Sequence, residues 1–334
     1  MKHITPYRLL KVLLMILILL PACGQADEHG RKRRSDPTKV EIRDYGKALF
    51  SVDTSDLQAE LKRLKHDYAF FLGADLDNPY NILQVRDFVQ DPFLRDIYAS
   101  VREVYPDYDD LEKKLSKLFD AFHEHFPDAR LPQVYTYISG LHYEAPVNLV
   151  DSVLLIAIDL FMGEDALFYK RIGMPRFIAQ RCTPDHVLPL SASVLSYSQV
   201  QQPIQGEDLI SLMINQGRLL YVASRLLPGT PEHLIIGYTP AQFQWCVSNQ
   251  EKTWAFLVDK DLLFSTDVAV IGKFMRDGPF TVSFPEESPA RLGWWIGWKI
   301  VQAYMQKHPQ TSIQELLNIT DAHAFLQASS YKPR

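Results

Sequence analysis

A short stretch with two histidines is the first place in this sequence where metal chemistry could be expected. "DAFHEHFPDAR" spans residues 120–130 and places His123, Glu124 and His125 in successive positions. Histidine nitrogens and carboxylate oxygens are common ligands of Zn²⁺, and a glutamate beside such an ion can act as a general base. Whether the two histidines can share one ion depends on the element that carries them.

The element around these histidines is predicted to be a helix over residues 109–126, because its apolar residues recur at helical spacing. Side chains two positions apart on a helix point about 200° apart, so His123 and His125 cannot bind one ion. The zinc-peptidase signature HExxH would need its second histidine where Pro127 stands. We interpret both histidines as favourable partners of the negative helix end. The apolar stripe consists of Leu111, Leu115, Leu118, Phe122 and Phe126.

The beginning of the chain has the features of an export signal. Three basic residues precede the uncharged run "VLLMILILL" at residues 12–20, which is too short to span a bilayer. "LPAC" at residues 20–23 then resembles a bacterial lipobox, although Pro21 departs from the usual residue type. We expect Cys23 to carry acyl chains that anchor the exported protein to a membrane. The alternative is an ordinary cleaved signal with Cys23 as an incidental thiol.

The composition predicts three segments. Residues 1–22 are the lipoprotein signal peptide, residues 23–40 the lipidated cysteine and a polar tether, and residues 41–334 a single domain. The tether contains "RKRR", which we interpret as part of a solvated linker, and because the protein is exported we expect no nucleic-acid partner. Cys182 and Cys246 could form a disulfide or remain buried thiols. No CxxC motif or Cys/His cluster indicates structural zinc.

Several further elements can be placed along the domain. A capping box of Ser55 and Gln58 predicts a helix with apolar residues from Leu57 to Phe71, and a second helix is expected over residues 91–105. Alternation predicts a strand in "QVYTYISGL", and the apolar run "NLVDSVLLIAIDLFMG" predicts one continuous buried strand. Helices follow these strands. Helices, then a small sheet, then more helices predict an α+β fold.

Two later helices are predicted from their first residues. Thr239 and Pro240 open one helix, and Gln242 completes its capping box. Its inner face is expected to contain Phe243, Cys246, Val247, Trp254 and Leu257.

The second of these helices lies in "SPARLGWWIGWKIVQAYM", where Ser288 is expected as N-cap and Pro289 as first helical residue. Gly293 and Gly297 are four apart and would let another backbone approach closely.

The tryptophans of this helix could be binding residues. Trp294 and Trp298 share a face, whereas Trp295 lies on a different flank and is expected to be the exposed one. Tryptophans can stack on sugar rings or anchor a protein partner. Packing in the core is the alternative for all three.

A series of motifs resembles the gliding-motility lipoprotein GldB family. The likeness includes the lipobox and essentially the whole domain, with six motifs in the same order. They are "IAIDLFMGEDALFYK" followed by "MPRFIAQRCTPDHVLP", then "LISLMINQGRLLY", "PEHLIIGYTPAQFQWCVSNQEKTWAFLVDKDLLFSTD", "GPFTVSFPEESPARLGWWIGWKIVQAYM" and "SSYKPR".

This family is in turn similar in pattern to predicted zinc peptidases of zincin-like fold, in which one helix carries HExxH and a later helix adds a glutamate before a glycine. The region matching HExxH is residues 187–202, which contain neither histidine nor glutamate, and His186 stands alone beside it. The third-ligand position corresponds to Gln216, whose amide cannot offset the charge of a metal ion. Gln216 is interpreted as a hydrogen-bonded core amide or as a remnant of a binding cleft.

The resemblance therefore implies a zincin-like α+β domain, mostly helical with a small central sheet, that lacks the metal ligands. We expect an exported, lipid-anchored lipoprotein of the periplasmic cell envelope that docks other gliding and secretion proteins, with no catalytic activity, metal or cofactor. A zinc-dependent or other hydrolase and a glycan- or peptide-binding module are the alternatives. Candidate binding residues are Gln216, His186, Arg291, Trp294, Trp295 and Trp298, with Cys23 as the lipidation site.

Overall fold

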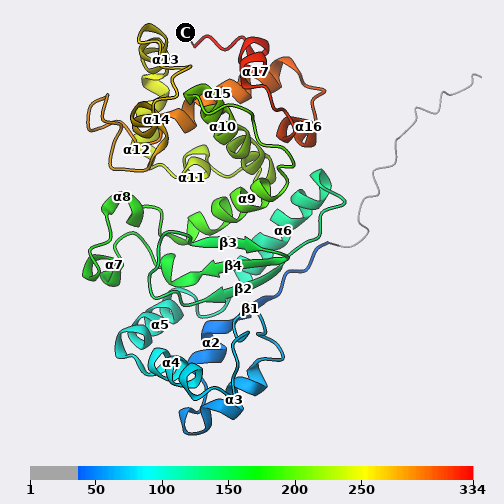
Figure 1. The fold of residues 1–334 in the computed structure, drawn as a ribbon, viewed down its shortest axis with the longest axis vertical. Helices are drawn as coiled ribbons and strands as arrows, with labels where there is room; N and C mark the ends of the chain where they lie inside the picture. The colour runs from blue at the N-terminus through cyan, green and yellow to red at the C-terminus, as the bar shows by residue number, and fades with distance from the viewer. Residues whose placement is uncertain (1–36, 334) are drawn as a thin grey trace, which may run out of the picture. The chain divides into compact units, whose positions relative to one another are not determined.

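A four-stranded mixed sheet is the central element of the computed structural model, which describes residues 37–333 (Figure 1). Cys23, the predicted signal and the tether up to residue 36 lie outside the described residues. The first three strands in the sheet order are parallel, and the last pairs antiparallel with its neighbour. In sheet order the strands are β1 (Ile42–Asp44), β2 (Gln133–Tyr137), β4 (Val153–Ala157) and β3 (Val147–Val150).

The long apolar run after Pro146 forms a hairpin, so the prediction of one continuous strand is wrong. β3 and β4 are joined by Asp151 and Ser152, and Asp151 has a φ of 53°. Aspartate tolerates this left-handed conformation better than most residues because its short polar side chain can bond locally. A short 3-10 helix at Ile158–Leu160 follows β4 and ends the run.

The N-terminal helices agree only partly with the sequence pattern. The helices expected over residues 91–105 and 109–126 are confirmed to within one residue at each end. The Ser55 capping box is wrong, because Asp53 accepts from the Ser55 amide and the Gln58 amide donates to Leu76 O. The helices are α2 (Tyr45–Phe50), α3 (Leu57–Leu64), α4 (Pro79–Gln90), α5 (Pro92–Val104) and α6 (Asp109–His125).

The sheet lies between the N-terminal helices α2–α5 and the C-terminal helices in Figure 1. On one side α2 packs against β2, and on the other α9 packs against β3. α9 in turn packs against α10, which packs against α15. The C-terminal helices are α7 (Leu167–Arg171), α8 (Arg176–Ala179), α9 (Val187–Ser198), α10 (Leu209–Leu226), α11 (Glu232–Ile236), α12 (Pro240–Ser248), α13 (Gln250–Asp259), α14 (Val268–Met275), α15 (Leu292–Lys307), α16 (Ile313–Leu317) and α17 (Ala322–Ser329).

The starts of two predicted C-terminal helices have different outcomes. The capping box of Thr239 and Gln242 is confirmed, with both reciprocal hydrogen bonds present. The inner face is only partly right, because the helix ends at Ser248 and Val247 is 48% exposed. The cap at Ser288 is wrong, since α15 begins at Leu292 after a buried loop.

α10 and α15 cross with their backbones in direct contact. A Cβ atom on Gly297 would lie 1.8 Å from the carbonyl oxygen of Met213, and one on Gly217 would lie 2.2 Å from the carbonyl carbon of Gly297. A Cβ on Gly293 would lie 2.5 Å from the sulfur of Met275. The close approach expected at Gly293 and Gly297 is confirmed, and it fixes the two helices that carry most of the C-terminal core.

The prediction of a mostly helical domain with a small central sheet is confirmed, and the domain mixes helices with a four-stranded sheet. Residues 37–333 belong to one compact unit with a large core around the sheet, α10 and α15. A smaller core lies among α2, α3 and α4. Within residues 37–333, none of the helices combines the length and the apolar character that a membrane span requires.

Candidate functional site

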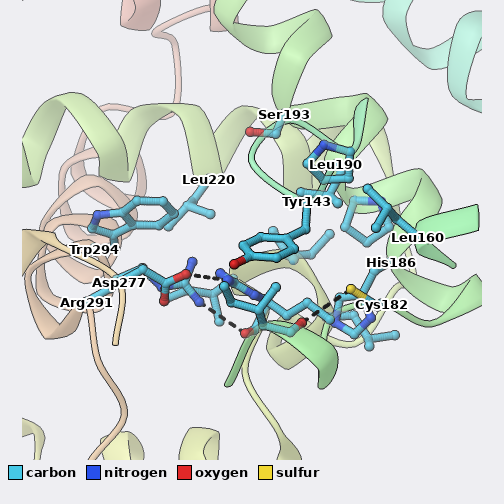
Figure 2. Close-up of a pocket in the computed structure, with 18 of the residues that line it drawn as sticks. Tyr143, Leu160, Cys182, His186, Leu190, Ser193, Leu220, Asp277, Arg291 and Trp294 are labelled. Carbon is cyan, nitrogen blue, oxygen red and sulfur yellow. Dashed lines mark hydrogen bonds and ion pairs between the residues drawn. The ribbon is translucent and has the colours of Figure 1, made fainter. Parts of the chain in front are cut away.

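A cavity of about 430 Å³ opens beyond the carboxyl end of β4 (Figure 2). Its walls come from the segments before and after the sheet hairpin and from four helices, α8, α9, α10 and α11, together with the start of α15. This size is in the range of small-ligand sites. We call this cavity the cleft; its lining includes Tyr143, Glu144, Leu160, Phe161, Ile178, Arg181, Cys182, His186, Pro189, Leu190, Ser193, Gln216, Leu220, Leu234, Gly237, Asp277, Arg291 and Trp294.

Two guanidinium groups and one carboxylate meet in the cleft. Arg181 Nη2 forms an ion pair with Asp277 Oδ2. Arg291 Nε lies 3.4 Å from Asp277 Oδ1, which is an ion-pair distance but lacks hydrogen-bond geometry. Arg291 Nη2 donates to Gly237 O at 3.1 Å. Asp277 therefore offsets only one of the two positive charges.

Arg291 is held in place by its backbone and by aromatic rings. It is the N-cap residue of α15 with a φ of 59°, a left-handed conformation that costs a non-glycine residue about 1–2 kcal/mol. Its guanidinium lies 4.6 Å from the centre of the Trp294 ring and 5.4 Å from that of Tyr238. Burial, followed by repulsion from Arg181, lowers the pKa of Arg291 to about 10, so the group stays charged near pH 7.

His186 is a neutral, buried side chain at the entrance to α9. Its Nδ1 lies 2.8 Å from Thr183 Oγ1, and its buried Nε2 has no hydrogen-bond partner among the described residues. Burial, followed by the charge of Arg181, lowers its pKa to about 4. The unpartnered ring nitrogen is a donor or an acceptor according to the tautomer, and it lies buried behind the cleft surface.

Gln216 stands on the cleft wall. It is half-buried on α10, directly before the Gly217 that contacts α15. Its amide makes no hydrogen bond to another residue of the described range 37–333, and it lies at the edge of the core rather than within it. The cleft therefore contains a polar group that a ligand could satisfy.

The tryptophans of α15 divide between the cleft and the core. Trp294 lines the cleft and its Nε1 donates to Met275 O at 3.1 Å. Trp295 and Trp298 are 1% and 0% exposed, so the expectation of an exposed Trp295 is wrong. The reason is that α15 is covered on more than one face: Trp295 contacts Phe243, with ring centres 5.0 Å apart, while the glycine face contacts α10.

The structure thus brings together His186, Gln216, Arg291 and Trp294, and it leaves Trp295 and Trp298 in the core. Sequence reasoning missed Arg181 and Asp277. Asp277 precedes a glycine, which signals a turn, but nothing in the pattern indicates that the turn meets α8 and α15.

The remaining candidates for chemistry lie elsewhere. Cys182 and Cys246 are both buried free thiols, and burial raises the pKa of each, to about 12 for Cys182. His123 and His125 lie in the last turn of α6, as predicted. The part of the chain that the structure describes holds no group of three or more His, Cys, Asp or Glu residues placed to bind one metal ion.

The comparisons with known proteins give one match. The model of a protein family described as gliding motility protein GldB matches residues 28–333. Neither a curated protein nor a solved structure matches the chain.

Proposed function

This chain belongs to the gliding motility protein GldB family, and from that premise we propose that it is an exported lipoprotein anchored through Cys23. In the cell envelope it docks other proteins of the gliding machinery and its associated secretion through the cleft. The apolar run of nine residues and the lipobox-like "LPAC" support export and lipidation. The polar residues after Cys23 give the folded domain reach from the membrane.

The observation that carries the docking proposal is a cleft with unsatisfied polar groups. Gln216 and the Nε2 of His186 lack hydrogen-bond partners among the described residues, and the Nε of Arg291 makes only a long ion-pair contact. Each unmade hydrogen bond of a buried group costs about 1–3 kcal/mol. Two of these groups, on His186 and Arg291, are buried, and the half-buried Gln216 leaves polar capacity on the same cavity for a partner.

We propose further that the cleft is a degenerate zincin-like site without catalysis. The region that resembles the HExxH helix forms α9, and the position of the third ligand is Gln216 on α10. Both helices contribute to the same cleft, α9 through Pro189, Leu190 and Ser193. None of these side chains can act as a carboxylate base.

A photo-crosslinking amino acid at Ser193 tests the docking proposal in intact cells. Ser193 lines the cleft and its hydroxyl makes no hydrogen bond to another described residue, so the replacement removes no hydrogen bond. The matched control is Tyr80 on α4, which is 64% exposed. We expect envelope proteins to be crosslinked from position 193 and not from position 80.

Two results would contradict the proposal. Identical products from both positions, or none from position 193 in a folded protein, would remove the cleft as the docking site. About one equivalent of tightly held zinc in the purified protein would refute the non-catalytic part.

A further inference from the structure

The inner part of the cleft has more positive than negative charge. Arg181 and Arg291 face the single carboxylate of Asp277, and the other acid that lines the cleft, Glu144, is exposed at its rim. Water screens an exposed charge more strongly than a buried one. An anion entering the inner part would therefore meet a net positive environment.

Arg291 also has unused hydrogen-bonding capacity. A guanidinium has five N–H donors, and among the described residues this one donates a single hydrogen bond, to Gly237 O. The residue is only 6% exposed, and its Nε has no hydrogen-bond acceptor. The Trp294 ring, whose centre lies 4.6 Å from the guanidinium carbon, limits the movement of these donors. A carboxylate can accept two parallel hydrogen bonds from such a fixed fork.

Apolar groups line the rest of the cleft. Figure 2 shows Arg291 and Asp277 close to Trp294, with Leu220 and Tyr143 nearby and Leu160 on the opposite side of the view. A ligand that pairs a carboxylate with an adjoining apolar group would satisfy both parts of the lining. The C-terminal residue of a peptide has this combination when its side chain is apolar.

We infer that the cleft binds the C-terminal carboxylate of a peptide between Arg181 and Arg291, with the apolar side chain of that residue against the partly exposed Leu190 and Trp294. This inference rests on the proposed docking function, for which it specifies the part of the partner that is recognised. Asp277 holds the two arginines together in the free protein and competes with the incoming carboxylate.

Titration calorimetry on the purified full chain tests this inference with N-acetyl-Leu-Leu as the free acid and as the C-terminal amide. We expect the acid to bind at least about tenfold more tightly than the amide, as a charge-assisted hydrogen bond implies. Arg181→Met should weaken acid binding about tenfold. Asp277→Asn should strengthen it, because the competing charge is removed. If the ion pair had a purely structural role, both Arg181→Met and Asp277→Asn would bind the peptide acid more weakly.

Two variants serve as controls. Arg225→Met removes an exposed arginine of α10 that does not line the cleft and should leave acid binding unchanged. Arg181→Lys keeps the charge and should bind the acid more tightly than Arg181→Met. If a thermal melt shows that Arg181→Met is not folded, the comparison of acid with amide on the unmodified chain still tests whether the carboxylate is recognised.

Equal binding of acid and amide, or no binding of either, overturns the inference. Weaker binding by Asp277→Asn also overturns it. Tighter binding of glucuronate than of the peptide acid refutes the peptide assignment in favour of an acidic sugar. These failures are separable from a failure of docking, because crosslinks from position 193 would persist if partners dock without a carboxylate.

Discussion

Gly297→Ala is expected to destabilise the protein strongly, because the α10–α15 crossing has no space for a methyl group. The added Cβ would lie 1.8 Å from Met213 O and 2.4 Å from Met213 C. Both are backbone atoms of a helix, so no rotamer change can relieve the overlap. Non-bonded carbon atoms rest about 3.5–4.0 Å apart, so the two helices must separate by more than about 1 Å at this point.

The magnitude follows from two opposing effects. Alanine gains about 1 kcal/mol over glycine in helix propensity. Overpacking in a core costs typically about 1–3 kcal/mol and more where backbones must move. Separating α10 from α15 also loosens contacts along two of the longest helices, which meet in the main core. We expect a net loss of about 3 kcal/mol, a large part of a typical stability of about 5–15 kcal/mol.

Urea denaturation followed by circular dichroism measures this loss, with Gly73→Ala as the matched control. Gly73 has no heavy atom within 4 Å of an added Cβ, so its variant should stay within about 0.5 kcal/mol of the parent. A Gly297→Ala variant as stable as the Gly73→Ala variant would show that the two helices do not meet backbone to backbone.

Two further predictions concern His186 and Cys23. The pKa of His186 is about 4 in the folded protein against an ordinary value of about 6.5, so its contribution to stability is present above pH 6.5 and is lost as the pH falls toward 4. Between pH 7.5 and pH 5 this contribution amounts to about 2 kcal/mol of unfolding free energy. In urea melts at these two pH values, the unfolding free energy of His186→Gln should therefore fall by about 2 kcal/mol less than that of the parent. Equal falls in the two proteins would refute the pKa assigned to His186. Cys23→Ser should abolish incorporation of labelled palmitate and move the chain from the membrane fraction to the aqueous fraction, whereas unchanged labelling would place the lipid elsewhere.

Local patterns in the sequence predicted the elements that local interactions determine. The 109–126 helix follows from its apolar stripe, and the start of α12 follows from the reciprocal bonds of Thr239 and Gln242. The close contact at Gly297 follows from the absence of a side chain. In each case the residues that signal the feature also make the interaction that stabilises it.

The errors occurred where distant contacts overrule the local pattern. The hairpin at Asp151 lies inside an apolar run that suits one long strand, and only pairing between its two halves shows the turn. Trp295 looks like a flank residue on an isolated helix, but Phe243 from α12 covers it. Ser288 and Pro289 have the composition of a helix start, yet α15 begins three residues later. Periodicity cannot report which other elements surround a helix.

The cleft combines both situations, which explains why only part of it was foreseen. Gln216 and His186 were identified because their positions depart from a pattern in a resembling family. Arg181 and Asp277 were missed because their relation to Arg291 exists only in three dimensions. If the Asp277→Asn variant binds the peptide acid more tightly, then Arg181 and Asp277, which the sequence did not predict, determine what the cleft recognises. Gln216 and His186 would then only shape the space around it.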